Sequence, residues 1–463
     1  MFLCREKELA VLNKRYNKQE FECIIIYGRR RVGKTALINE FCQGKPTIFF
    51  SALNASENEN LVALSKAIHA YKTGQEENYP LYQSFDAALE EITRLAAEQR
   101  LVFVIDEYPY LAKSSASISS RLQHLIDHKW QPSQLYVILC GSSMSFMENQ
   151  VLGYESPLYG RRTAQLKLSS LTYKETAEFV PQLAAKDKAL VYGITGGIPH
   201  YINKLQVRDC VDTALTENLF DSASYLFEEP QNLLKQELRE PGVYNSIITA
   251  IAGGASRINE IATKAGLENA VCAKYIKVLV DLGILLKETP LTEKVGKKSI
   301  YLICDNFFRF WYRFVPTNYS AINAGRFSAL YEQVVKPHLS TYMGLVFETM
   351  CKDYLLRYAT FLPIPLANIG QWWGTDNVAK KEVQIDIVGI SANSDEYLIG
   401  SCKYKNEKVG MDDLILLRQY AQAFGKGSAY HYYIFSKAGF TTELQVAAAR
   451  GEVNLVTLED LYK

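Results

Sequence analysis

The stretch GRRRVGKT, residues 28–35, decides the fold, because it carries glycine, four residues, glycine, lysine and threonine at the fixed positions of a phosphate-binding loop. The apolar run 23–27 before it predicts a buried strand, and residues 35–41 after it have the apolar spacing of a helix. Backbone N–H groups in such a loop point at phosphate oxygens, and the helix adds the positive end of its dipole. The stretch therefore predicts a nucleotide-binding site.

The individual residues of this loop have distinct expected roles. Lys34 should reach the β and γ phosphates, and Thr35 should bind the metal ion. The residues expected to line the nucleotide are Gly28, Arg29, Arg30, Arg31, Val32, Gly33, Lys34, Thr35 and Ala36.

A second stretch, LVFVIDEYPYL at residues 101–111, supplies the partner that the loop requires. Its apolar run predicts a buried strand that ends in the adjacent carboxylates Asp106 and Glu107. At the carboxyl end of a strand beside the loop, Asp106 can hold the water shell of the metal. Glu107 can orient and deprotonate the attacking water. The two stretches together predict nucleotide hydrolysis rather than binding alone.

Two further features of the N-terminal half each have more than one possible role. The strand predicted in LYVILCGSS, residues 135–143, ends in Ser142 and Ser143, either of which could sense the γ-phosphate or simply end the strand. Arg161, followed by Arg162, is expected on a loop beside the sheet. Arg161 could stabilise transition-state charge, in this subunit or in a neighbouring one. The alternative is that it forms a surface ion pair.

Composition excludes several classes of protein. A net charge of +1 over 463 residues leaves room only for a local nucleic-acid patch, and no apolar run reaches the roughly 20 residues of a membrane span. The nine cysteines are scattered without a Cys-x-x-Cys pair, which favours free thiols over disulfides or zinc. We expect a cytoplasmic protein of two to four domains.

The combination of FLCREKEL, GRRRVGKT, VIDEYPYL, ILCGSS, PLYGRR and TGGIPHYI resembles the archaeal-type ATPases, which are STAND-class P-loop NTPases related to AAA+ proteins. The resemblance covers residues 1–240 and implies ATP and Mg²⁺ as cofactors. It also implies that Pro199, in a Gly-x-Pro element on a helical lid, lies near the nucleotide and that hydrolysis acts as a slow switch. Pro199 also has the position of a helix-initiating proline after a Gly-Gly turn.

Residues 258–303 predict a winged helix. Two helices, 258–265 and 268–282, have a helix-turn-helix rhythm. The second has apolar Val271, Tyr275, Val278 and Leu279 on one face. A hairpin of strands 284–287 and 299–303 follows. Its loop carries Lys294, Lys297 and Lys298, which could bind DNA phosphates together with Lys274 and Lys277. The alternative is an interdomain packing module without DNA contact.

The last third predicts an aromatic core helix and then a new domain. The stretch YLICDNFFRFWYRFV, residues 301–315, is expected to be buried, with base stacking as the alternative. From residue 342 the order is helix, strand, strand, helix. This layout resembles the domain of unknown function that accompanies these ATPases and is related to PD-(D/E)XK nucleases. Glu348, Asp386 and Lys403 match a nuclease site, but Ser401 stands where a carboxylate is expected, so cleavage should be weak or lost.

The expected fold is α/β: a P-loop NTPase parallel sheet with a helical lid, a winged helix and a restriction-endonuclease-like domain. The expected boundaries are 1–170 for the ATPase core, 171–240 for the lid, 241–305 for the winged helix and 306–463 for the C-terminal domain. The expected function is a magnesium-dependent ATPase that switches attached DNA- or protein-binding modules, with a homo-oligomer as one candidate state. The alternatives are a nucleotide-gated scaffold with negligible turnover and an ATP-regulated DNA endonuclease.

Overall fold

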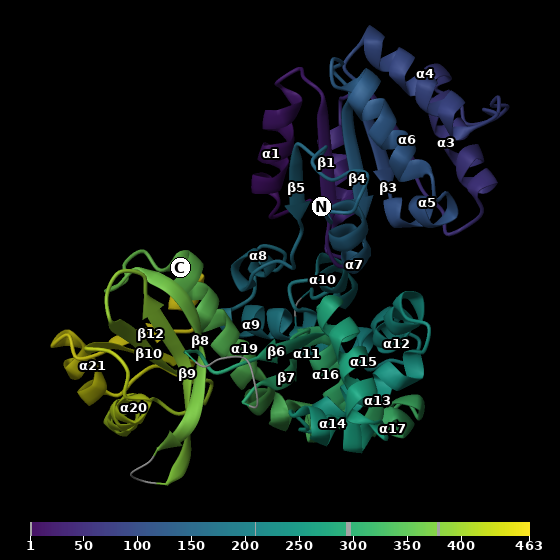
Figure 1. Cartoon of the computed structure of the whole chain (residues 1–463). Coiled ribbons are helices and arrows are strands. Elements are labelled where there is room, and N and C mark those ends of the chain that lie inside the picture. Colours follow the sequence, from purple (N-terminus) through teal and green to yellow (C-terminus); the bar gives the residue numbers. More distant parts are fainter. Residues whose placement is uncertain (1, 209, 293–297, 377–379) are drawn as a thin grey trace. The chain divides into compact units, whose positions relative to one another are not determined.

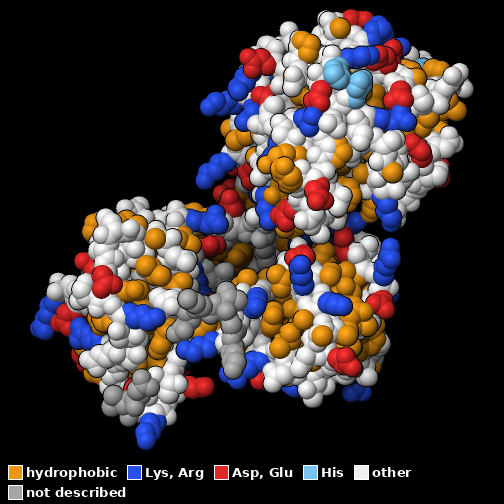
Figure 2. Space-filling view, in the orientation of Figure 1, with side chains coloured by type: hydrophobic (Ala, Val, Ile, Leu, Met, Phe, Trp, Pro, Cys, Tyr) orange, Lys and Arg blue, Asp and Glu red, His pale blue; other side chains and the backbone are white. Residues whose placement is uncertain are grey.

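The computed structural model describes residues 2–208, 210–292, 298–376 and 380–463 (Figure 1). The chain divides into two compact units, Met1–Ser170 and Leu171–Lys463. The four-part division expected from the sequence stays a prediction. On the face drawn in Figure 2, acidic and basic side chains are interspersed over each unit, in keeping with the net charge of +1. Within the described ranges, no helix has both the length and the apolar character needed to cross a membrane.

The first unit is built on a five-stranded sheet in the order β2-β3-β4-β1-β5, in which every neighbouring pair is parallel. The central strands β1, β3 and β4 are buried along their whole length, which is why their sequences are unbroken apolar runs. The short edge strands β2 and β5 were not predicted. The strands are β1 (Glu22–Tyr27), β2 (Thr47–Ser51), β3 (Val102–Asp106), β4 (Tyr136–Gly141) and β5 (Ala164–Lys167).

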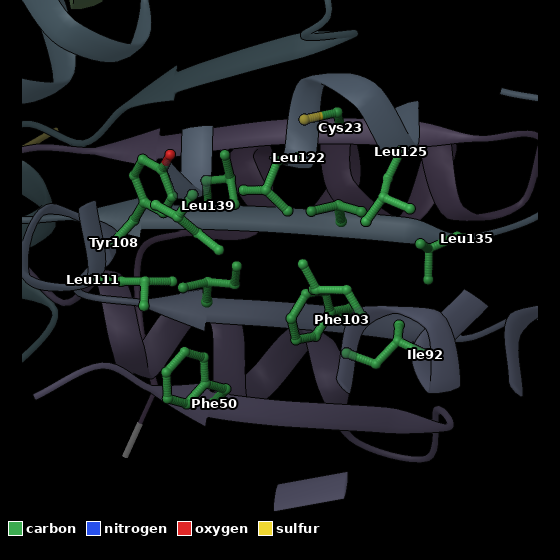
Figure 3. Packing of buried hydrophobic residues seen from close by; sticks show 14 of the residues in the cluster. Cys23, Phe50, Ile92, Phe103, Tyr108, Leu111, Leu122, Leu125, Leu135 and Leu139 are labelled. Carbon is green, nitrogen blue, oxygen red and sulfur yellow. The ribbon is translucent and has the colours of Figure 1, made fainter. Parts of the chain in front are cut away.

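Helices cover both faces of this sheet, and alternate residues of β1 point into two separate cores. Ile24 and Ile26 pack with Leu37 of α2, whereas Cys23 and Ile25 belong to the core under the later helices. Figure 3 shows the larger core, where Phe50, Phe103 and Leu139 of three strands meet Ile92, Leu111 and Leu122 of three helices. The helices are α1 (Glu6–Tyr16), α2 (Lys34–Cys42), α3 (Glu57–Thr73), α4 (Phe85–Glu98), α5 (Tyr108–Ser114), α6 (Ile118–Leu125), η1 (Ile126–Trp130), α7 (Met144–Phe146) and η2 (Met147–Val151).

The second unit begins with helices and a two-stranded hairpin. The predicted helix-turn-helix and hairpin are present as α14, α15, β6 and β7. Of the apolar face predicted for the second helix, Leu279 is buried, but Val271 is 38% exposed. The buried side of α15 consists of Cys272, Ile276 and Leu279. The elements are α8 (Tyr173–Ala177), α9 (Ala185–Thr195), α10 (Pro199–Leu205), α11 (Val211–Asn218), α12 (Tyr225–Glu237), α13 (Pro241–Ala252), α14 (Ile258–Ala265), α15 (Asn269–Asp281), β6 (Leu285–Glu288) and β7 (Ile300–Ile303).

The aromatic stretch forms α16 (Asn306–Phe314), and its large rings are buried, which confirms the core helix rather than a stacking platform. Trp311 donates its indole N–H to the Phe227 carbonyl at 2.6 Å. The elements that follow are η3 (Pro316–Asn318), α17 (Tyr319–Asn323), α18 (Phe327–Leu330), η4 (Tyr331–Val335) and η5 (Lys336–His338).

The C-terminal part is a mixed sheet in the order β12-β11-β10-β9-β8, with β8, β9 and β10 antiparallel and β10, β11 and β12 parallel. Helix α19 lies along one face, and α20 and α21 pack on the other (Figure 1). Strands β8, β11 and β12 were not predicted. The elements are α19 (Leu339–Asp353), η6 (Tyr354–Tyr358), β8 (Leu366–Asp376), β9 (Lys381–Ser391), β10 (Glu396–Lys403), α20 (Met411–Phe424), β11 (Ala429–Ser436), α21 (Thr442–Ala449), β12 (Asn454–Thr457) and η7 (Asp460–Tyr462). All nine cysteines are free, as predicted.

A close backbone approach at Gly197 generates a stability prediction. Gly197 has φ +68°, and a Cβ there would lie 2.0 Å from the Leu171 carbonyl oxygen, whereas Gly266 has the same φ and nothing within 4 Å. Gly266→Ala should therefore cost only the left-handed conformation, about 1–2 kcal/mol. Gly197→Ala should cost about 1–3 kcal/mol more, because the backbone must move. Thermal unfolding measures both, and equal melting temperatures for the two variants would contradict the close approach.

Candidate nucleotide-binding site

The predicted phosphate loop connects β1 to α2. Gly28 has φ +155°, and a Cβ on it would lie 2.3 Å from the Leu168 carbonyl oxygen, so the tight exit from β1 requires glycine. Val32 is buried, while Thr35 and Ala36, at the start of α2, are exposed. The loop thus has a buried base and an accessible rim.

Lys34 is the first residue of α2 and is only 7% exposed. Its ammonium donates to the Gly28 carbonyl at 2.9 Å and to the Arg29 carbonyl at 3.0 Å. Burial lowers the pKa of this lysine, partly offset by the negative charges of Glu107 and Asp106. The positive charge therefore lies within the loop, on the side of the two carboxylates.

Thr35 and Asp106 meet although 71 residues separate them: the threonine hydroxyl donates to Asp106 Oδ2 at 2.9 Å. Asp106 is 6% exposed, and its other oxygen accepts the Glu107 backbone N–H at 3.0 Å. Burial and the neighbouring Asp106 carboxylate raise the pKa of the Cys140 thiol well above its usual value, so this cysteine stays protonated. A hydroxyl and a carboxylate side by side are hard oxygen ligands, a donor set that fits Mg²⁺.

Glu107 follows Asp106 with left-handed backbone angles, φ 52° and ψ 45°, at the start of α5. Its Oε2 accepts the Ser142 hydroxyl at 2.9 Å and the Ser142 backbone N–H at 3.3 Å. The sequence left Ser142 either as a sensor of the γ-phosphate or as a simple strand end. The structure shows that it hydrogen-bonds the Glu107 carboxylate, and a phosphate contact stays a prediction. Ser143 makes no side-chain capping bond to α7.

Two contacts of the loop were missed from the sequence. Arg5, 7% exposed, donates to the Val32 carbonyl at 3.2 Å and to the Ser169 carbonyl at 2.6 Å. Arg30 donates to the Tyr110 hydroxyl at 2.6 Å and ties the loop to α5. The FLCREKEL stretch contained Arg5, but residue type and spacing do not reveal which carbonyls a buried arginine will reach.

Arg161 lies at the other end of the sheet from the loop. Two residues later, the Thr163 backbone N–H donates to the Cys23 carbonyl near the amino end of β1. By contrast, Asp106 is the last residue of β3, and the loop with Lys34 follows the carboxyl end of β1. The Arg161 guanidinium pairs with both oxygens of Asp127 at 2.8 and 2.7 Å and lowers the pKa of that carboxyl. Its ion pair was one predicted alternative; a role at the site of a neighbouring copy stays a prediction.

Pro199 belongs to the second unit and is the first residue of α10. Only Ile198 separates it from Gly196 and Gly197, both of which have positive φ. The structure shows the helix-initiating role that the sequence suggested. Its predicted place near the nucleotide stays a prediction.

The predicted nuclease residues come from α19, β9 and β10. Ser401 donates to Asp386 Oδ2 at 3.4 Å, and the Cys402 backbone N–H donates to the same oxygen at 2.8 Å. Burial, and then the charge of Asp386, raise the pKa of Glu348 to about 7. Lys403 instead lies 3.6 Å from Asp413. Within the described part of the chain, no three His, Cys, Asp or Glu side chains gather into a group able to hold a metal ion.

The basic residues of the winged helix are only partly covered by the structure. Lys274 and Lys277 on α15 and Lys298 before β7 are exposed. Lys294 and Lys297 lie outside the described residues.

Two parts of the chain match known protein families. Residues 2–205 match an ATPase domain predominantly from Archaea, and residues 311–414 match a family described as archaeal and bacterial proteins of unknown function. An uncharacterized ATP-binding protein of Methanocaldococcus jannaschii is 49% identical over 45 residues, 10% of this chain and 76% of that protein. The solved structure of a Walker-type ATPase of Pyrococcus abyssi superposes with a TM-score of 0.53 at 19% identity, over 67% of this chain and 96% of that one, and shows the same fold.

An uncharacterized protein of Methanocaldococcus jannaschii is 31% identical over 413 residues, which is 88% of each chain. The chain therefore belongs to the same protein family as this relative, and residues 2–205 are its archaeal-type ATPase domain.

Proposed function

We propose that this protein binds ATP with Mg²⁺ and hydrolyses it slowly, as a switch that changes the arrangement of its attached modules. The observation that carries the proposal is the hydrogen bond of Thr35 to Asp106, with Glu107 next in sequence and held by Ser142. These residues supply a metal-binding pair and a proton acceptor at one edge of one sheet.

The chain's own residues suit the steps of hydrolysis. Thr35 and Asp106 are the residues that would hold Mg²⁺, which neutralises phosphate charge when bound. Lys34 adds the fixed positive charge of the loop, and its burial strengthens that charge's effect on a bound phosphate. Glu107 takes the proton of the attacking water, and the two hydrogen bonds from Ser142 fix where its Oε2 points.

The partners of the switch are proposals of the same kind. DNA or a protein is the expected partner of the winged helix and the C-terminal domain. A homo-oligomer would let Arg161, which lies at the opposite end of the sheet from its own phosphate loop, approach the site of a neighbouring copy. A nucleotide-gated scaffold without turnover is the alternative.

Two variants separate nucleotide binding from hydrolysis. Lys34→Ala should abolish measurable ATP binding by calorimetry, because it removes the buried ammonium that is expected to reach the β and γ phosphates. Lys45→Ala, beyond the other end of α2, is the matched control and should bind normally. Glu107→Gln should bind ATP but lose about 10²–10⁴-fold in phosphate release, because an amide cannot accept the proton. Normal ATP affinity in Lys34→Ala, or normal turnover in Glu107→Gln, would contradict these assignments.

Ser142→Ala tests whether orientation of Glu107 matters. The change removes the 2.9 Å hydroxyl bond and keeps the 3.3 Å backbone bond. We expect about tenfold slower turnover with unchanged ATP affinity, since one hydrogen bond to a charged group contributes about 1.5–3 kcal/mol. Ser143→Ala is the control and should hydrolyse ATP at the wild-type rate. If both variants match the wild type, Ser142 does not position the base.

A second candidate function concerns the C-terminal domain. We propose that it has a nuclease-like fold that docks DNA or a protein and cleaves DNA weakly or not at all. Three antiparallel strands, β8 to β10, followed by the parallel strands β11 and β12 support this proposal, as does the proximity of Glu348, Asp386 and Ser401. Ser401 stands where a nuclease site would have a further carboxylate, so the site lacks a negative charge on which its affinity for a metal ion depends.

Ser401→Glu should restore metal binding, and Ser401→Asp serves as a second variant because Ser401 is only 8% exposed. Calorimetry with Mn²⁺ should show a new site in at least one of them, lost again when Asp386→Ala is added. Strong metal-dependent cleavage of a plasmid by the unmodified protein, abolished by Asp386→Ala, would show that the docking proposal is wrong.

A further inference from the structure

Helix α6 runs directly into η1, and the exposed side of this continuous helix carries two histidines, His124 and His128, here called the histidine pair. The two rings lie next to each other, with centroids 4.5 Å apart and planes inclined at 54°. Histidines spaced i and i+4 on one helical face are a recurring pair of metal ligands. Imidazole is also the side-chain group that suits Zn²⁺, Cu²⁺ and Ni²⁺.

The separation of the two rings suits a shared metal ion. With metal–nitrogen distances of about 2.0–2.1 Å, two imidazoles at adjacent coordination positions of one ion have centroids on the order of 4.5–5 Å apart. The observed separation of 4.5 Å falls at this value. The rings therefore need only to turn, so that one nitrogen of each is aimed at the ion, and little conformational freedom has to be lost on binding.

The backbone beneath the histidine pair is held by the interior of the first unit. Leu125, Ile126 and Trp130 are buried in the larger core, where Figure 3 labels Leu125, and the Trp130 indole donates to the Thr93 hydroxyl at 2.8 Å. The Gln131 backbone N–H donates to the Ile126 carbonyl at 3.2 Å, which is the i to i+5 bond of a π-helical turn. Such turns inside helices are frequent at functional sites. The pair is thus mounted on a fixed helix, as a preorganised site requires.

The charges near the histidine pair permit a cation. Nearby basic groups are each bound to a carboxylate, and these ion pairs are Arg121–Asp86, Lys129–Glu90 and Arg161–Asp127. The hydrogen bonds from Arg161 lower the pKa of Asp127, and the charges of Arg161, His128 and His124 lower it further. The Asp127 carboxylate is therefore close enough to interact with both rings, and its negative charge favours a cation bound by them.

We propose that His124 and His128 form a two-ligand site for a divalent transition-metal ion of the Ni²⁺, Cu²⁺ and Zn²⁺ group. One nitrogen of each ring binds the ion, and water or a small chelator fills the remaining positions. A third protein ligand is not needed, in keeping with the absence of any larger ligand group among the residues that the structure describes. The site is separate from Thr35 and Asp106, whose hard oxygens suit Mg²⁺ instead. It can be tested without ATP.

The probe is Ni²⁺ held by nitrilotriacetate, a chelate with adjacent positions open for a pair of imidazoles. The protein is the untagged full chain carrying Cys210→Ser and Cys304→Ser, which removes the exposed thiols. Calorimetry should show one binding site per chain. His124→Ala and His128→Ala should each lower the affinity by about 10²-fold or more, because two linked ligands bind about 10²–10⁴-fold more tightly than either alone. His338→Ala is the matched control, since His338 is an exposed histidine of η5, and it should bind like the parent chain.

Electron spin resonance with Cu²⁺–nitrilotriacetate gives a second readout, because the nitrogen modulation of the spin echo counts the imidazoles bound to the copper. The parent chain should show two imidazoles, and each single variant should show one or none. Absence of nickel binding by the parent chain would overturn the proposal. So would nickel affinity that either substitution leaves unchanged, or a copper spectrum of the parent chain with a single imidazole.

Discussion

The hydrogen bond between the Thr35 hydroxyl and Asp106 is the interaction on which the nucleotide site depends. It exists because β1 and β3 are parallel strands of one sheet, separated only by β4, so that their carboxyl ends reach the same edge. The apolar faces of both strands are buried in the two cores of the unit, which fixes the distance between loop and carboxylate. The position of the Thr35–Asp106 contact at the edge of the sheet therefore depends on how the two cores are packed.

The residues next to that contact hold conformations that an isolated chain would avoid. Glu107 has left-handed angles, and Gly28 approaches a carbonyl too closely for any side chain. Ser142 and Leu168, which hold them, follow β4 and β5. Local strain at the site is thus balanced by strands from elsewhere in the sheet, an arrangement common where a catalytic group must be held in one orientation.

The second unit uses burial and charge differently. Glu348 and Asp386 form a carboxylate cluster in this unit. Burial raises the pKa of Glu348 to about 7, and Asp386 accepts a hydrogen bond from the neutral Ser401 hydroxyl. Lys352, which pairs with Glu288, supplies positive charge near this cluster. This environment suits a docking surface that responds to its neighbours better than a site built for a tightly bound divalent ion.

The sequence by itself determined the phosphate loop, the strand ending in two carboxylates, the winged helix and the aromatic core helix. Each depends on local spacing or on an unbroken apolar run, which neighbouring residues reveal. Short edge strands such as β2 and β12 were not predicted from the sequence, because a few half-buried residues show little hydrophobic periodicity. Only the tertiary structure decided that Ser142 holds Glu107 and that Arg161 lies at the opposite end of the sheet. Those contacts join residues far apart in the chain, and no local pattern encodes which distant atoms will meet.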